Sequence, residues 1–527
     1  MPERPAARPI RPFALLLACA APLAAQAPGI EQRAMGTGPG PVLVASFDGL
    51  GHGFTGPQGR SIQRNPSDNS IAVGPDHIVQ TINTRVAIFT KRGARFDTTG
   101  KALYGPVPST NLFRGFGGAC EEITSGDVVV RYDQLAGRWL FVMPVFRRVR
   151  PRTAPHGPRE AVLYQPTPAD SVNAPPRPLP PPPPADSGAY AMCYAVSASS
   201  DPMGAWYRYE FTRPLFPDYP RPAVWPDGWY LPTSTGDDVI EKHVCVADRT
   251  RMLRGEEATE QCVIVPGVNF LNTSDLDGMA PPPEGAPNLV VAAGGTQLQG
   301  ILASDALYAW RLHVDWADPS RTRLDGPERL TVAPYRYLCG GQLTECVPQP
   351  GVTRRLDSQG DKLMARLVYR RFPTHEALVA VHSIETANGA GGVRWYELRV
   401  AADRTLRVHQ QGTFAPDALY RWMASPAIDR LGNIGIGYST GGAEEFAGQR
   451  FAGRTPGAPL GTLDLRETVL VRGAAAQTST LRWEDYTQTA VDPSDDCTIW
   501  YVGDYLQAGA TNYSTRIGAF RLPGCGG

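Results

Sequence analysis

Residues 128–142 have the sequence VVVRYDQLAGRWLFV, and this stretch decides the fold. Two runs of β-branched and aromatic residues flank a turn that contains Asp and Gly, which is the pattern of a β-hairpin. Similar stretches occupy residues 71–83, 222–233, 355–369, 426–439 and 490–502. A seventh, degraded copy starts at residues 288–295 and continues at residues 307–315. The hairpin is therefore the repeating unit of this chain.

The spacing of the hairpins predicts the architecture. Most copies follow one another after about 65 residues, and the one longer interval contains the proline-rich segment 148–187, which we expect to be a surface insertion. A repeat of this length accommodates one four-stranded sheet with long loops. We therefore predict an all-β protein, a seven-bladed β-propeller of four-stranded antiparallel blades. A β-sandwich pair seldom repeats one hairpin so often, and a β-helix needs a much shorter period.

Composition supports a loop-rich β protein and excludes several classes. The 527 residues include 55 Gly and 51 Pro, with 42% hydrophobic and 19% charged residues, which fits neither a disordered chain nor a helical bundle. Lys plus Arg and Asp plus Glu both number 51, so no broad positive field exists to attract nucleic acid or an anionic membrane. No phosphate-binding loop, zinc-protease motif or hydrolase serine motif in its proper context occurs.

The N-terminal sequence predicts export. Residues 1–27 combine three arginines, an apolar stretch and a run of small residues, which is typical of a secretory signal peptide. An alternative is lipoprotein processing before Cys19, which would anchor the chain to a membrane. No later stretch is apolar enough to span a bilayer. We predict a 28–60 N-terminal arm, a 61–527 propeller, and a monomer that is secreted, periplasmic or on the cell surface.

Eight cysteines follow the signal segment, and in an exported chain they predict four disulfides. Spacing alone leaves the connectivity open. Cys339 and Cys346 close a short loop and form the first expected pair. Cys245 with Cys262 and Cys497 with Cys525 come next, and the remaining cysteines are Cys120 and Cys193.

Polar residues precede several of the hairpins. In a propeller the chain enters each innermost strand from one face, so these residues are expected to gather around a central funnel. Carboxylates brought together in this way either bind a cation such as Ca²⁺ or supply an acid–base pair, unless they only bond the turn backbone. The predicted ligand-binding residues are Asp68, Asp127, Asp218, Tyr219, Arg421, Trp422, Trp483 and Asp485.

The hairpins also carry a family resemblance. Residues 425–438 (SPAIDRLGNIGIGY) resemble the Asp-box or BNR-type hairpins of sialidase-like β-propellers, in which Asp and Gly shape the turn. The segments FPDYPRPAVWPDGWY, GVRWYELR and RWEDYTQTAVDPSDDCTIWY resemble a group of secreted bacterial propeller proteins of unassigned activity. The resemblance covers roughly residues 61–523 and implies a propeller fold. The Arg-Ile-Pro segment typical of sialidases is absent, so their catalytic residues do not transfer directly.

Two functional hypotheses follow. The first is a non-catalytic extracellular binding module that holds a glycan, peptide or surface partner at the funnel. The alternative is a glycoside hydrolase or polysaccharide lyase of sialidase-like architecture. Its candidate catalytic residues are Asp218, Glu484, Asp485 and Tyr486, with Arg421 as the grip for a substrate carboxylate.

Overall fold

The computed structural model describes residues 30–149, 161–162, 188–233, 241–298, 301–341 and 345–525. The predicted signal peptide and most of the proline-rich insertion fall outside these residues. The fold is all-β, as predicted, and no helix in the described part is long and apolar enough to cross a membrane. Its helical elements are short: α1 (Ala119–Glu122), α2 (Arg249–Leu253), η1 (Ser109–Phe113), η2 (Pro319–Arg321) and η3 (Leu338–Gly340).

Four-stranded antiparallel runs recur along the chain, each starting with its innermost strand. The first three are β5 (Ser70–Val73), β6 (His77–Ile82), β7 (Arg85–Thr90) and β8 (Ala102–Pro108); β9 (Val129–Asp133), β10 (Arg138–Val149), β12 (Ala189–Ser197) and β13 (Ala205–Arg213); and β14 (Ala223–Trp225), β15 (Gly228–Thr233), β16 (Glu241–Ala247) and β17 (Glu260–Pro266). The next three are β18 (Asn272–Leu276), β19 (Asn288–Ala293), β20 (Ala306–His313) and β21 (Arg323–Thr331); β22 (Leu367–Arg371), β23 (Glu376–Glu385), β24 (Gly391–Val400) and β25 (Leu406–Phe414); and β26 (Tyr420–Ile428), β27 (Ile434–Gly441), β28 (Gly448–Arg454) and β29 (Thr468–Val471).

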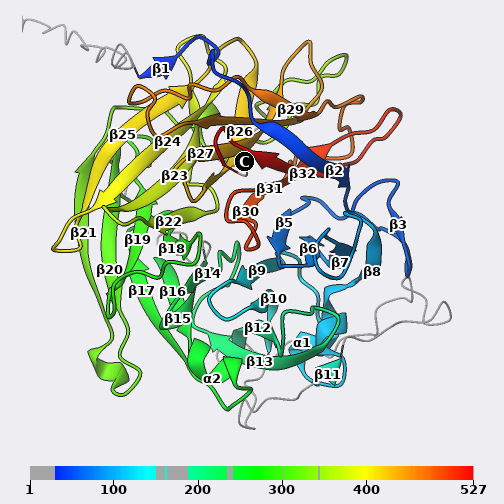
Figure 1. Cartoon of the computed structure of the whole chain (residues 1–527), viewed down its shortest axis with the longest axis vertical. Helices are drawn as coiled ribbons and strands as arrows, with labels where there is room; N and C mark the ends of the chain where they lie inside the picture. The colour runs from blue at the N-terminus through cyan, green and yellow to red at the C-terminus, as the bar shows by residue number, and fades with distance from the viewer. Residues whose placement is uncertain are drawn as a thin grey trace, which may run out of the picture.

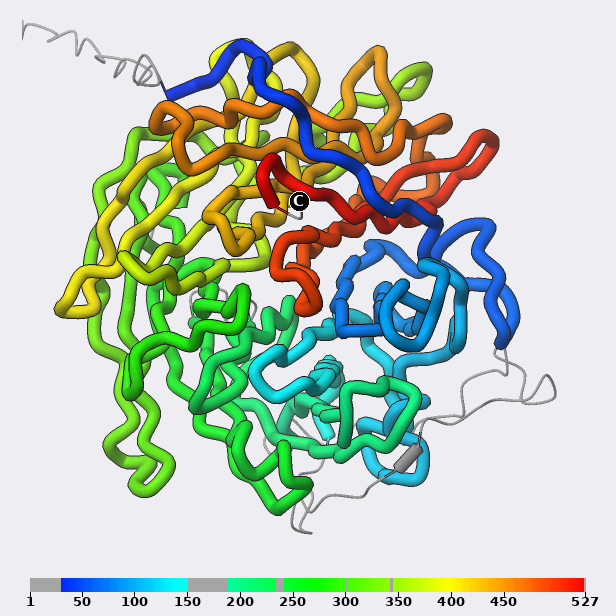
Figure 2. Tube along the Cα trace, in the orientation of Figure 1, coloured from blue at the N-terminus to red at the C-terminus, as the bar shows by residue number. Residues whose placement is uncertain are grey.

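The last run combines both ends of the described chain. Strands β30 (Gln488–Val491), β31 (Ile499–Tyr505) and β32 (Ser514–Arg521) are completed by β2 (Val42–Asp48), which pairs antiparallel with β32. Figure 2 shows this N-terminal segment lying along the C-terminal one. The remaining short strands are β1 (Glu31–Gln32), which is parallel to β25, β11 (Ala161–Val162), which pairs with β13, and the pair β3 (Thr55–Gly56) and β4 (Gly59–Arg60).

The runs follow one another around a common centre in chain order (Figure 1). The innermost strands contact each other in the cycle β5, β9, β14, β18, β22, β26 and β30, and β30 contacts β5. Strands β18 and β22 also pair in parallel, which joins two runs into one nine-stranded sheet. Closing the cycle in this way leaves no inner sheet edge exposed. The arrangement is propeller-like.

Aspartates form the turns between inner and second strands. The Asp429 carboxylate accepts hydrogen bonds from the backbone N–H groups of Leu431 (2.9 Å) and Asn433 (3.0 Å), and from the Asn433 side chain (2.6 Å). Gly432 in the same turn has a φ of 84°, a conformation that suits glycine. The Asp-Gly signal in the sequence therefore reports the turn chemistry of the sheets and not a catalytic group.

One predicted hairpin is wrong. Residues 355–369 do not pair with one another, because the innermost strand β22 begins only at Leu367 and pairs with β23. Residues 357–361 form a buried loop instead. The degraded seventh copy corresponds to β19 and β20, which do form an antiparallel pair.

Four disulfides link the described residues, and all eight predicted cysteines take part. The three expected pairs, Cys339–Cys346, Cys245–Cys262 and Cys497–Cys525, are confirmed, and Cys120 pairs with Cys193. This pattern fits a protein that folds in an oxidising compartment.

Candidate functional site

The lead-in loops before the innermost strands have an unusual backbone. Non-glycine residues with positive φ are uncommon, and such backbone strain tends to concentrate at functional sites. The loops before β5, β9, β14, β22 and β30, together with a bulge in β26, contain Asp68 (51°), Asp127 (51°), Tyr219 (55°), Gln359 (46°), Met423 (49°), Glu484 (57°) and Asp485 (69°).

Hydrogen bonds tie the lead-in loops together at one end of the axis. The Tyr219 N–H donates to the Asp127 carboxylate (2.8 Å), and the Asp127 N–H lies 3.4 Å from a carboxylate oxygen of Asp68. The Tyr219 hydroxyl donates to the backbone carbonyl of Asp485. The structure thus brings together residues from four loops that are distant in sequence. We call Asp68, Asp127, Tyr219, Asp485 and Tyr486 the axial cluster.

The carboxyl groups of the cluster contact one another. The side chains of Asp68 and Asp127 are hydrogen-bonded to each other, and Asp127 is also bonded to Asp218. Burial raises the pKa of Asp127 well above its usual value, and the charges of Asp68 and Asp218 and the bond to Asp218 raise it further. Burial and the charge of Asp485 raise the pKa of Asp68, whereas its bond to Asp127 lowers it. Asp127 is therefore the carboxyl group best placed to keep a proton near neutral pH.

Asp485 has a different environment. Burial raises its pKa, but the guanidinium of Arg482, which bonds to one carboxylate oxygen, opposes this effect. Gln359 donates to the other oxygen at 3.0 Å. The pKa of Asp485 stays above its usual value, but Arg482 favours its ionised form, whereas the carboxyl groups around Asp127 favour its protonated form. Carboxyl groups in environments that differ in this way are what acid–base chemistry needs.

Tyr486 contributes an unsatisfied hydroxyl group. The residue is only 3% exposed, and its hydroxyl oxygen has no hydrogen-bond partner among the residues that the structure describes. Burial raises its pKa well above the usual value, followed by the charges of Asp127 and Asp68. Its ring packs edge-on against Tyr219 with the centroids 5.0 Å apart. A buried phenol of this kind is available to donate to a ligand.

Cations border the cluster, and the sequence analysis missed them. The Lys362 ammonium lies 5.1 Å from the ring centroid of Tyr219 and 4.1 Å from that of Phe270, and the Arg221 guanidinium lies 4.3 Å from the Tyr219 centroid. Lys362 also donates to the side chain of Gln359. Assigning residues 355–369 to a hairpin hid Lys362, because its side chain comes from a loop before β22.

Arg482 and Asp218 are the more exposed side chains beside the cluster. Asp68 is fully buried, and Asp127 and Asp485 are 6% and 7% exposed. By contrast, the Arg482 side chain is 32% exposed, and Asp218 is half-buried. A ligand arriving from solvent therefore meets Arg482 and Asp218 first.

Glu484 does not face the cluster, although it lies in the same loop as Asp485 and Tyr486. Its carboxylate accepts hydrogen bonds from Ser439 (2.9 Å), from Gln449 (2.9 Å) and from the backbone N–H of Asp504 (2.6 Å). These contacts hold β27, β28 and β31 together. Of the candidate catalytic residues, Glu484 is the one whose contacts are structural.

Arg421, Trp422 and Trp483 are also core residues. Strand β26 begins at Tyr420, so Arg421 and Trp422 lie inside the sheet rather than before it. Arg421 pairs with Glu467 (2.9 Å) and Asp417 (2.7 Å). Trp422 and Trp483 are fully buried with ring centroids 6.2 Å apart. None of the three offers a face to a ligand in this structure.

The carboxylates of the axial cluster do not form a compact metal site. Within the described ranges, the one group of three potential ligand atoms lying within 4.8 Å of one another is Cys245, Glu260 and Cys262. Its two cysteines form a disulfide, so they cannot act as thiolate ligands. The Ca²⁺ that the sequence analysis considered therefore has no three-carboxylate cage of this kind at the axial cluster.

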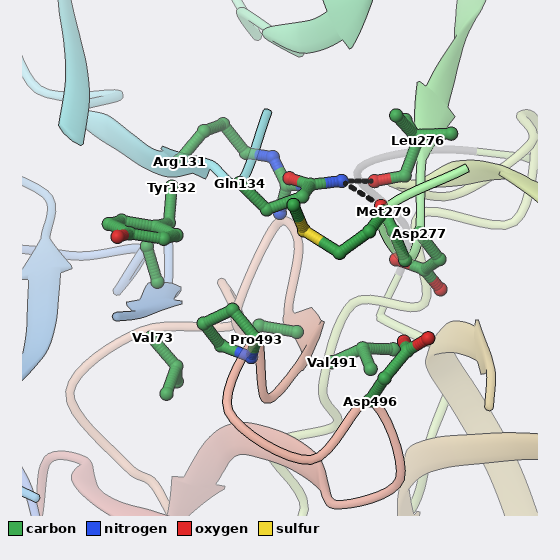
Figure 3. A pocket seen from close by; sticks show the side chains of 13 residues that line it. Val73, Arg131, Tyr132, Gln134, Leu276, Asp277, Met279, Val491, Pro493 and Asp496 are labelled. Carbon is green, nitrogen blue, oxygen red and sulfur yellow. Dashed lines mark hydrogen bonds between the residues drawn. The ribbon is translucent and has the colours of Figure 1, made fainter. Parts of the chain in front are cut away.

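Ion pairs lie beyond the cluster and line a pocket there together with Tyr486. Arg366 bonds to Asp275 (2.5 Å) and Asp277 (2.6 Å), and Arg131 bonds to Asp275. A pocket of about 420 Å³ opens at the other ends of the inner strands (Figure 3). There the Gln134 amide donates to the backbone carbonyls of Leu276 and Gly278. The axial cluster and this pocket thus lie at opposite ends of the inner strands.

We expect stability to depend on pH through buried carboxyl groups such as Asp504. Burial raises its pKa to about 7, although hydrogen bonds from Asn69 and Ser67 oppose the shift. A raised pKa in the folded state gives stability that is present below the unfolded value of about 4 and lost as the pH rises through 7. Between pH 5 and pH 8 the free energy of unfolding of wild type should fall, and about 2 kcal/mol of this fall comes from Asp504. In Asp504→Asn the fall should be smaller by that amount. Urea unfolding at both pH values measures it.

The exposed Asp97→Asn variant is the control for this measurement and should keep the wild-type pH dependence. If Asp504→Asn shows the same loss as wild type between the two pH values, the Asp504 carboxyl is not protonated in the folded state as proposed.

No family model and no curated protein sequence matches this chain. Among solved structures, the polysaccharide lyase Uly1 aligns with a TM-score of 0.36 and 11% identity over 93% of this chain and 100% of that chain. An exo-β-1,3-galactanase from Clostridium thermocellum aligns with a TM-score of 0.30 and 10% identity over 91% and 97%. The WD40 domain of SCAP from fission yeast aligns with a TM-score of 0.32 and 9% identity over 85% and 84%. All three TM-scores lie below 0.5, and the function proposed next rests on the site.

Proposed function

We propose that this protein is an exported, seven-bladed β-propeller that acts on a polysaccharide at the axial cluster, as a glycoside hydrolase or a polysaccharide lyase. The observation that carries the proposal is the Asp127 carboxyl group, which is bonded to both Asp68 and Asp218 and lies in one cluster with Asp485. A carboxyl group that holds a proton near an ionised carboxylate is the minimal equipment for cleaving a glycosidic bond.

Each residue has a role in this proposal. Asp127 is the general acid that protonates the leaving oxygen, and Asp485 is the carboxylate that acts as base or nucleophile. Tyr486 donates a hydrogen bond to the reacting sugar or, in a lyase, shares the proton transfer. The partly exposed Arg482 and the half-buried Asp218 hold the chain of the substrate at the opening.

The seven blades are the antiparallel runs that begin with β5, β9, β14, β18, β22, β26 and β30. Two observations support this assignment: these strands contact one another in a cycle, and β2 completes the last run. The signal peptide at residues 1–27 and the monomeric state remain part of the proposal. The disulfides support the exported location.

A binding module is the second candidate, and the low exposure of the cluster favours it. Asp68, Asp127 and Tyr486 are each less than a tenth exposed, so a ligand that stays at the opening contacts Arg482 and Asp218 without reaching the Asp68–Asp127 pair. Such a protein would hold a glycan or peptide and release it unchanged.

Asp127→Asn tests the proposed function. The amide can accept the bond from the Tyr219 N–H and donate to Asp68 or Asp218, so the fold should be retained, but it cannot deliver a proton. We expect turnover to fall by about 10²–10⁴-fold on the polysaccharide that wild type cleaves. The assays are release of reducing ends and appearance of unsaturated uronic products over a panel of neutral and acidic polysaccharides.

The matched control is Asp429→Asn, which changes an equally buried carboxylate in the turn between β26 and β27. It should keep full turnover per folded molecule. If wild type binds a polysaccharide of the panel but cleaves none, the enzyme proposal fails and the binding module stands. If Asp127→Asn cleaves as fast as wild type, Asp127 is not the acid.

A further inference from the structure

A second pocket lies outside the axis, between the run β22–β25 and the run β26–β29. Its volume is about 480 Å³, and it is bordered by the β26–β27 turn and by Pro456 after β28. The residues that give it its chemistry come from the β22–β23 turn and from β24, β25 and β28: His375, Glu397, Arg399, His409, Gln410 and Arg454. None of them belongs to the axial cluster.

Positive charge is in surplus in this pocket. Glu397 is the one carboxylate in its lining, and it bonds to Arg399 at 2.6 Å and to the amide of Gln410. Arg454 is 2% exposed and donates to the backbone carbonyls of Ala458, Pro459 and Thr462 instead. Within the described part of the chain, Arg454 forms no ion pair closer than 4 Å. The lining therefore contains two guanidinium groups and one carboxylate, which forms an ion pair with Arg399 alone.

One of the guanidinium groups, that of Arg399, has an unsatisfied hydrogen-bond donor. The Nη1 atom of Arg399 is buried and has no hydrogen-bond partner among the described residues, although the side chain as a whole is 28% exposed. Burial lowers the pKa of Arg399, and the charge of Arg454 lowers it further. A buried guanidinium nitrogen without an acceptor costs free energy that an incoming anion would recover.

Two histidines at the rim add further hydrogen-bond donors. His375 and His409 are exposed, and His375 stacks on Phe372 with the ring centroids 4.8 Å apart, which fixes its orientation. An imidazole N–H can donate to an oxyanion in either protonation state. Because the donors come from different strands and turns, an anion with oxygens pointing in several directions satisfies them better than a planar carboxylate does.

We propose that this pocket is a binding site for a sulfate or phosphate group, with Arg399 as the direct donor and Arg454 as the buried countercharge. The group is either an ester on a glycan or the free inorganic anion, since both present the same tetrahedral oxygens. The site is separate from the axial cluster, and its occupancy does not depend on the proposed enzymatic activity.

Thermal shift and calorimetry with sodium sulfate and sodium phosphate test this proposal on the full-length secreted chain. At constant ionic strength against sodium chloride, we expect sulfate or phosphate to raise the melting temperature of wild type. Arg399→Gln should weaken the affinity at least tenfold, and Arg399→Lys, which keeps the charge but not the planar donor fork, should fall between the two.

Arg407→Gln is the matched control, because Arg407 pairs with Arg399 across β24 and β25 but does not line the pocket. It should bind like wild type, as should Asp127→Asn, whose change concerns only the axial cluster. A sulfated oligosaccharide and its desulfated form separate the sources: tighter binding of the sulfated sugar than of free sulfate indicates an ester ligand, and the reverse indicates the inorganic anion. No anion-specific shift in wild type, or equal weakening by Arg399→Gln and Arg407→Gln, would overturn the proposal.

Discussion

Replacing Tyr486 by Phe is expected to abolish function while leaving the protein as stable as before, or more so. The hydroxyl has no hydrogen-bond partner in the described structure, and a buried unsatisfied polar group costs roughly 1–3 kcal/mol. Its removal should therefore leave the free energy of unfolding unchanged or raise it by about 1 kcal/mol. If the phenol contributes to proton transfer at the axial cluster, turnover should fall by about 10²–10⁴-fold. Urea unfolding and polysaccharide cleavage, measured on the same preparation, separate the two effects.

Tyr209→Phe is the matched control for this change. Tyr209 is also fully buried, but its hydroxyl donates to the carbonyl of Glu256 at 3.0 Å. It lies on β13, which β10 and β12 separate from the inner strand β9. We expect this variant to lose about 1 kcal/mol of stability and to retain turnover. The opposite pattern, in which Tyr486→Phe is destabilised and still active, would assign Tyr486 to the core and remove it from the site.

The largest loss of stability is expected for Arg366→Met. Arg366 bonds to Asp275 and Asp277 on the axis, and removing one side of a buried ion pair typically costs about 3–5 kcal/mol because the remaining charge is uncompensated. Burial alone would raise the pKa of Asp275, but Arg131 and Arg366 hold it below its usual value. We therefore expect a loss of this size in the unfolding free energy at pH 7.

The pH dependence of this variant checks the mechanism. Without Arg366 the pKa of Asp275 should rise, because Arg131 remains as its one guanidinium partner. A rise in the folded-state pKa removes stability at high pH and not at low pH. Part of the loss should return at pH 5, and adding Asp277→Asn should restore part of it at pH 7. The exposed Arg407→Met should change stability by less than about 0.5 kcal/mol. A small loss for Arg366→Met at both pH values would mean that water replaces the guanidinium.

Local signals predicted the repeating unit well. The Asp and Gly residues around position 429 form the turn that the sequence indicates, because their bonds lie within five residues of one another. The same locality explains the Cys339–Cys346 pair. Where the structure depends on distant partners, prediction was limited. Gln359 bonds to Asp485 across 126 residues, and nothing in the sequence around Gln359 indicates this.

The structure brings some of the predicted site residues together and places others in the core. Asp68, Asp127, Tyr219 and Asp485 converge because each lies in a lead-in loop at the same face of the ring. Arg421 was expected there on the same argument, but strand β26 already begins at Tyr420, so Arg421 lies within the strand. Glu467 on a neighbouring segment holds the Arg421 guanidinium in the core. Strand boundaries decide such cases, and hydrophobic pattern alone does not fix them.

Strand β2, near the start of the described chain, pairs with β32, the last strand. Thr515 bonds to the carbonyl of Leu50 across 465 residues, so the ring cannot close until almost the whole polypeptide has been synthesised. Until then β2 carries Val42 and Val44 with no partner beside it, and both remain partly exposed even afterwards. A nascent or truncated chain would thus expose an unpaired, aggregation-prone strand edge. The yield of folded protein would then depend on chaperones that cover such edges.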